Sequence, residues 1–143
     1  MDIKRLFSKK TEYYLSYVKF NELPINGYEN SDTQILDSID LNETQNDKII
    51  YTIKRDISFE PKCIFDLSVE LKVIKYFNED VDINEIEKVD WKKTLFEERD
   101  FFSQGVMEDM SLTIAFITKQ SAYPTYTTPP VFITAEDLKE INS

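Results

Sequence analysis

The side chains that most often carry enzyme chemistry are scarce in this chain of 143 residues. It contains no histidine, one cysteine (Cys63) and two glycines, Gly27 and Gly105. Histidine is the usual general base near neutral pH and the commonest metal ligand, so triads and zinc sites that need it are excluded. The glycines lie far apart and form no phosphate-binding loop. We therefore predict a protein that is not an enzyme and that uses no cofactor.

Carboxylates are the reactive groups present in number, but their spacing does not favour chemistry. Neighbouring pairs such as Glu97–Glu98 point in different directions on a helix, whereas acid–base catalysis needs opposed groups in a cleft. The acidic stretch 78–84 lacks the glycine and the final glutamate of an EF-hand loop. Cys63 has only Lys62 beside it to support a thiolate, so we interpret it as a small buried apolar residue. No catalytic residue and no metal site are predicted.

The charge and composition of the chain limit the classes of partner it can bind and the number of domains it can form. The chain has 27 acidic and 17 basic residues and a formal charge of −10, which opposes nucleic-acid phosphates and anionic lipid heads. No window approaches the roughly 20 apolar residues of a membrane helix, and the N-terminus lacks the apolar stretch of a signal peptide. We expect one cytoplasmic domain over residues 1–143, with a flexible terminus at 1–10, no nucleic-acid partner and no membrane insertion.

Three segments have the composition of β-strands. Residues 13–23 and 49–59 are rich in aromatic and branched side chains and end near Pro24 and Pro61. In residues 65–73, apolar and polar side chains alternate, which predicts a strand with one buried face. The short corner at Pro61 favours an antiparallel hairpin between the second and third strands. The polar segment 24–47 is expected to be a long loop with at most one helical turn.

Two segments favour helix. Residues 83–102 contain good helix formers, although 89–96 could instead supply a fourth strand at the sheet edge. Residues 106–120 form a clearer helix with one apolar stripe and a second apolar flank. Since one sheet needs only one stripe, the second flank predicts a second buried contact, either with a partner subunit or within the chain's own fold. The predicted oligomer interface contains Met110, Leu112, Ala115 and Phe116.

The segment 123–132 contains three prolines and cannot be helical, so it should run as an extended strap. Its aromatic rings are suited to line a groove that holds an extended peptide. The predicted peptide-binding residues are Tyr123, Tyr126 and Phe132. Thr134 and Asp137 form a capping pair for a short final helix. The predicted fold is therefore α+β: an antiparallel sheet of three to four strands packed by a long helix, with a proline-bearing strap and a short C-terminal helix.

This order of elements resembles the SecB-type protein-export chaperones. The resemblance rests on Tyr123-Pro124 and on Pro130-Val131-Phe132, which match an aromatic-Pro pair and a Pro-Val-Asn-Phe-like motif after the long helix. A weaker match covers Tyr51-Thr52 and residues 56–60. The family's Pro-Tyr-Ala-Arg phrase is replaced here by residues 108–111, Glu-Asp-Met-Ser.

The resemblance implies a homo-oligomer, dimer or tetramer, assembled through the long helices. It also implies a groove between strap and sheet for unfolded polypeptide, and an acidic sheet face that docks the SecA motor. The leading hypothesis is thus a SecB-like chaperone or peptide-binding protein that holds non-native chains for export. The alternative is a non-catalytic assembly or accessory protein, such as a phage component, which the missing Pro-Tyr-Ala-Arg phrase favours. An enzyme that uses only carboxylates and tyrosines is the third and least supported hypothesis.

Overall fold

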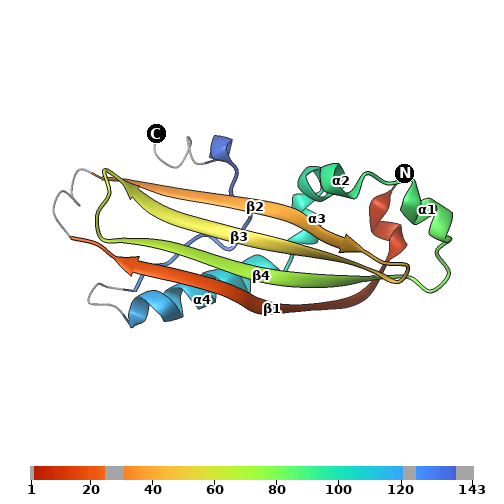
Figure 1. Ribbon diagram of the computed structural model, residues 1–143, viewed down its shortest axis with the longest axis horizontal. Helices are drawn as coiled ribbons and strands as arrows, with labels where there is room; N and C mark the ends of the chain where they lie inside the picture. Colours follow the sequence, from red (N-terminus) through yellow and green to blue (C-terminus); the bar gives the residue numbers. More distant parts are fainter. Residues whose placement is uncertain (1, 25–30, 121–124, 138–143) are drawn as a thin grey trace.

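The structure, a computed structural model, describes residues 2–24, 31–120 and 125–137. Long antiparallel strands form a sheet, with α4 and the C-terminal segment behind it and the shorter helices at one end (Figure 1). The elements are η1 (Ile3–Leu6), β1 (Phe7–Glu22), β2 (Asp32–Thr44), β3 (Lys48–Glu60), β4 (Phe65–Phe77), α1 (Ile83–Glu87), α2 (Trp91–Glu97), α3 (Arg99–Phe102) and α4 (Val106–Lys119). The α+β class and the packing of the long helix on the sheet confirm the sequence prediction.

The strands of the sheet are ordered β1-β4-β3-β2, and all neighbouring pairs are antiparallel. β3 and β4 form the central hairpin that was predicted at Pro61, with Ile53 opposite Leu71. Along both strands, burial alternates with a period of two, because one face packs on the helices and the other faces solvent. We call these the inner and outer faces of the sheet.

The inner face carries the hydrophobic core. Leu95 of α2 and Met110 and Ile114 of α4 are fully buried in the same core as the inward side chains of β3 and β4. Two buried polar groups are satisfied within it: the Tyr51 hydroxyl donates to the Phe102 carbonyl (2.6 Å), and the Trp91 indole donates to the Ile86 carbonyl (3.0 Å). These bonds fasten the short helices to the sheet and to each other.

One predicted loop is wrong, because residues 32–44 form the edge strand β2 rather than a connection. Ile35 and Ile39 point inward and are buried, and Asp37 between them is buried as well. A charged residue at an inward position broke the apolar alternation that identifies a strand. The fourth strand of the fold is therefore β2, and residues 89–96 do not supply it.

Two other segments also differ from the sequence prediction. The N-terminal residues, expected to be flexible, form η1 and the start of β1 from Ile3 onward, and Leu6 is fully buried. The predicted helix over 83–102 is split into α1, α2 and α3. The first two begin at the side-chain caps Asp82 and Asp90, which accept hydrogen bonds from backbone N–H groups.

Candidate polypeptide-binding site

An exposed apolar surface runs along β1 and the adjacent side of α4. On β1, Leu15 is 50% exposed and Val18 is 38% exposed. On α4, Leu112 is 68% exposed and Phe116 is 67% exposed. We call these four residues the β1–α4 surface. Exposed apolar patches are typical of surfaces that contact another chain.

The geometry of α4 explains why this surface is open. Val106, Met110 and Ile114 recur at helical spacing and bury the opposite side of the helix against the sheet. Inward positions of β1 pair with inward positions of β4, as Leu15 does with Leu71. Whereas Leu71 is buried beneath the helices, Leu15 at the sheet edge is not. α4 therefore covers the centre of the sheet and leaves the inner side of β1 open.

Tyr13 fixes the start of α4 beside β1. Its hydroxyl donates a hydrogen bond to the Asp109 carboxylate in the first turn of α4. This bond, together with partial burial, raises the pKa of Tyr13 above its ordinary value. Asp109, Leu112 and Phe116 are separated by three and four residues and share one helix face. The face that carries Leu112 and Phe116 thus follows β1.

A hollow of about 620 Å³ lies where the ends of β1 and α4 meet. It is lined by Phe20, Asn21, Glu22, Phe116, Ile117 and Gln120. Phe20 stacks at a tilt on Phe65 of β4, with ring centroids 5.5 Å apart. Phe65 in turn meets the Tyr126 ring at 5.5 Å, so a row of rings joins the hollow to the C-terminal segment.

The structure describes two of the three predicted peptide-binding residues, Tyr126 and Phe132. Tyr126 is half-buried, with its ring edge-on to Phe59 and Phe65, and burial raises its pKa. Phe132 is only 5% exposed and belongs to the core, so it does not line an open groove. Tyr123 lies outside the described residues. The sequence of an extended, proline-held segment does not reveal which way its rings point.

The four predicted interface residues separate into two groups. Met110 is fully buried within the chain's own core and has no surface to offer a second copy. Leu112 and Phe116 are the most exposed large apolar residues of α4, and Ala115 is half-buried between them. The second apolar flank of the helix is therefore real, and it consists of Leu112, Ala115 and Phe116.

Sequence reasoning missed a buried ion pair that holds the strap, here residues 125–133. Arg55 of β3 donates from Nε and Nη2 to the two carboxylate oxygens of Asp37 on β2, at 2.8 and 2.7 Å. Both side chains are fully buried. The same guanidinium donates to Thr128 Oγ1 (2.8 Å) and to the carbonyls of Pro129 (2.7 Å) and Val131 (2.6 Å).

Asp37 extends this network along the strap. Its Oδ2 accepts the Ile133 N–H at 2.7 Å, and its own N–H donates to the Ile133 carbonyl at 3.2 Å. Burial raises the pKa of the Asp37 carboxyl, while Arg55 and the Ile133 N–H act in the opposite direction. Ser111 of α4 also donates to the Pro129 carbonyl at 3.1 Å. The pair thus joins β2, β3 and the strap, with α4 beside them.

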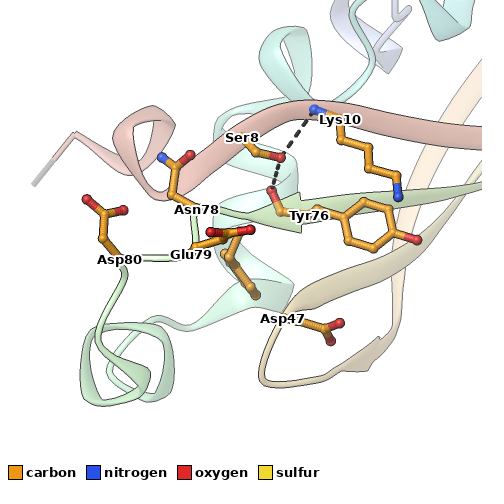
Figure 2. A pocket seen from close by; sticks show the side chains of 8 residues that line it. Ser8, Lys10, Asp47, Tyr76, Asn78, Glu79 and Asp80 are labelled. Atoms are coloured by element: carbon orange, nitrogen blue, oxygen red, sulfur yellow. Dashed lines mark hydrogen bonds between the residues drawn. The ribbon is translucent and has the colours of Figure 1, made fainter.

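A second hollow, of about 710 Å³, is polar and lies at the other end of β1. Figure 2 shows the carboxylates of Asp47, Glu79 and Asp80 around it, pointing in different directions. The Lys10 ammonium lies 4.4 Å from the centre of the Tyr76 ring. Across the described ranges, no group of three acidic or cysteine residues is arranged to hold a metal ion. This hollow offers no apolar surface comparable to the β1–α4 surface.

Comparison with solved structures identifies the fold of this chain. The Rv1957 SecB-like chaperone of Mycobacterium tuberculosis, in complex with a ChAD peptide from the Rv1956 HigA1 antitoxin, superposes with a TM-score of 0.60 at 9% identity. The match covers 82% of this chain and 86% of that one. The fold is SecB-like. A protein of unknown function from Streptococcus agalactiae matches at a TM-score of 0.46 and 9% identity, over 84% of this chain and 97% of that one. No family model and no curated protein matches the sequence.

The outer face of this SecB-like sheet carries charges of both signs. On that face Lys54 lies opposite Glu70, whereas Lys72 lies opposite Thr52 and Asp56 lies opposite Ser68. The negative charge is concentrated elsewhere, since residues 78–120 contain 11 acidic and 5 basic residues. No helix formed by the described residues is long and apolar enough to cross a membrane.

Proposed function

We propose that this protein is a SecB-like chaperone that holds extended, non-native polypeptide on its β1–α4 surface. The observation that carries the proposal is the exposure of Leu112 and Phe116 beside an open hollow lined by Phe20. The solved SecB-like chaperone that shares the fold was captured with a bound peptide. A long edge strand beside an apolar helix face suits an extended chain, because apolar side chains of the client can pack between the two.

The strength of such binding follows from the size of the surface. Burying one large apolar side chain contributes about 1.5–3 kcal/mol, and an aromatic pair adds about 0.5–1.5 kcal/mol. Three or four such contacts, less the cost of ordering the client, give weak and reversible binding. Weak binding without sequence-specific polar contacts is what a holding chaperone requires.

The test is whether the protein delays the aggregation of a chemically unfolded client, followed by light scattering. The wild-type chain is expected to suppress aggregation at a few-fold molar excess, and Phe116→Ser should lose most of this effect. Phe96→Ser is the matched control, because Phe96 is a 51% exposed phenylalanine on α2, near the opposite end of the sheet from the hollow (Figure 1). Equal suppression by both variants would contradict the proposed site.

A second candidate function is assembly without client binding. It is favoured by the same α4 face, since Leu112, Ala115 and Phe116 form a stripe that two copies of the helix could bury against each other. Light scattering measured together with hydrophobic-dye binding separates the two functions. A fixed oligomer that binds no dye and does not delay aggregation favours assembly, whereas dye binding and delayed aggregation favour the chaperone.

A contact with the SecA motor has less support than polypeptide binding. The resemblance implied an acidic sheet face for that contact, and the outer face here carries Lys54 and Lys72 as well as Glu70 and Asp56. The acidic helical half of the chain is the more suitable surface for a basic partner.

A further inference from the structure

The strap is held by the buried side chains of Phe132 and Ile133 and by hydrogen bonds to its backbone, and the backbone bonds cannot come from a regular strand pairing. Pro129 and Pro130 lack N–H groups, so this part of the chain cannot form a regular ladder with β2 or β3. Its carbonyl groups still need donors, because a buried unpaired carbonyl is costly. The carbonyls of Pro129 and Val131 find their donors in the side chains beneath the strap.

Arg55 supplies those donors from one side chain. Its guanidinium binds Thr128, Pro129 and Val131 of the strap at 2.6–2.8 Å, and it also makes two bonds to Asp37 and a long one, of 3.5 Å, to Ser111. A guanidinium is planar and its N–H groups form a rigid fork. Displacing it by about 1 Å would therefore weaken all of these bonds together, and the strap would be released as a unit.

Asp37 holds the other end of the strap, at Ile133. Its carboxylate orients Arg55 and also accepts the Ile133 N–H, so the strap is attached to both members of one ion pair. Fully buried ion pairs lose much of their Coulomb attraction to desolvation. Such a pair specifies where the strap sits more than it stabilises the whole fold.

The docked strap covers an aromatic cluster. The Tyr126 ring meets Phe59 and Phe65 edge-on, at centroid distances of 6.1 and 5.5 Å. Phe65 is 2% exposed, and its other neighbour, Phe20, lines the hollow at the end of β1. If the strap left its place, this cluster would extend the apolar hollow along the end of the sheet toward the β3–β4 hairpin.

We propose that Arg55 and Asp37 form a latch, and that the strap is a lid with a docked and a released position. In the docked position the latch holds residues 128–133 and Tyr126 covers Phe59 and Phe65. In the released position the core of β3 and β4 stays folded and the aromatic cluster becomes accessible. The latch operates whether or not the chain binds polypeptide.

The test is native-state hydrogen exchange of individual amides in the full chain. The reporters are the N–H groups of Ile133 and Tyr126, which bond to Asp37 and to Thr118 Oγ1. In Arg55→Lys, which keeps the charge but cannot form the fork, they should exchange about tenfold faster or more. Amides of Ile53 and Leu71 in the central strands should keep their protection. Equal acceleration of strap and core amides would overturn the proposal, because the strap would then open only by global unfolding.

A double variant separates the latch from the stability of the fold. Asp37→Leu combined with Arg55→Met removes both charges, leaves the Val131 carbonyl without the Arg55 donor and leaves the Pro129 carbonyl with Ser111 alone. In this variant the strap amides should still exchange fast, although the free energy of global unfolding returns toward the wild-type value. Wild-type protection of the strap in the double variant would overturn the latch, because apolar contacts would then be sufficient to dock the strap. Lys54→Met, next to Arg55 on the outer face, is the matched control and should change neither set of amides.

Discussion

Arg55 and Asp37 face each other on adjacent strands, and both of their side chains are withdrawn from solvent. The two guanidinium–carboxylate bonds are 2.8 and 2.7 Å long. Because the pair also binds Thr128, Pro129, Val131 and Ile133, it connects the sheet to the segment that crosses its inner face. A pair of inward-facing charges thus positions the strap on the sheet, and neither the strap nor β2 has a regular apolar pattern in the sequence.

Breaking this pair on one side should be far more costly than removing it. Arg55→Met leaves the Asp37 carboxylate buried without its partner and is expected to lower the free energy of unfolding by about 3–5 kcal/mol. Adding Asp37→Leu should recover most of this loss. Urea unfolding at pH 7 measures both variants. Additive losses in the double variant would contradict the account of the pair as one unit.

Tyr51 should make a separate contribution that depends on pH. Tyr51→Phe leaves the buried Phe102 carbonyl without its donor and should cost about 1–3 kcal/mol. Burial also raises the pKa of Tyr51 well above its usual value. Above pH about 10 the unfolded chain loses this proton while the native state keeps it, so the stability of the wild type falls with rising pH.

Unfolding measured in urea from pH 8 to 11 checks this prediction. The stability difference between the wild type and Tyr51→Phe should shrink as the pH rises through this range. Tyr14→Phe is the control, because Tyr14 is 51% exposed. A difference that stays constant up to pH 11 would show that the hydroxyl is not buried as described.

Lys75 should show the opposite dependence on pH. Its ammonium lies 4.6 Å from the Phe101 ring centre, and burial lowers its pKa. Between the lowered native pKa and the usual value of about 10.4, the unfolded chain binds a proton that the native state lacks. The wild type should therefore gain stability relative to Lys75→Met as the pH rises toward about 10. Lys72→Met, on the outer face of the same strand, corrects for the loss of one positive charge.

Self-association should depend on the exposed flank of α4. If copies bury this flank, Leu112→Ser and Phe116→Ser each remove a large apolar contact from both partners and should weaken association about tenfold to a hundredfold. Sedimentation over a range of concentrations measures the effect. Met110 makes no contact outside its own core, so Met110→Leu should leave association unchanged. Association that survives the Leu112→Ser/Phe116→Ser double variant would place the interface elsewhere.

The elements with regular apolar spacing could be predicted from the sequence. The alternation in β4 and the stripe of α4 identified both correctly, because one face of each is buried. β2 could not be recognised, since Asp37 occupies an inward position where the pattern requires an apolar residue. A signal was present: Asp37 and Arg55 are charges of opposite sign at inward positions of two strands. Their pairing became visible only when the register was known.

The candidate site was partly predictable for a related reason. The apolar flank with Leu112 and Phe116 exceeded what one sheet can bury, so an exposed surface on α4 could be inferred from helical spacing. The role of β1 could not, because nothing in its sequence says that it lies at an edge that α4 leaves open. Phe132 was assigned to a groove because a proline-bearing segment has no period from which the buried side of its rings can be read.

The most direct test of polypeptide binding is site-specific crosslinking. A photoreactive phenylalanine analogue is placed at position 116 or, as a control, at position 96, and each protein is irradiated with a labelled, unfolded client. The account predicts a strong crosslink to the client from position 116, reduced by Leu112→Ser, and little or none from position 96. Equal crosslinking from both positions, or crosslinks from position 116 only to further copies of this chain, would contradict it.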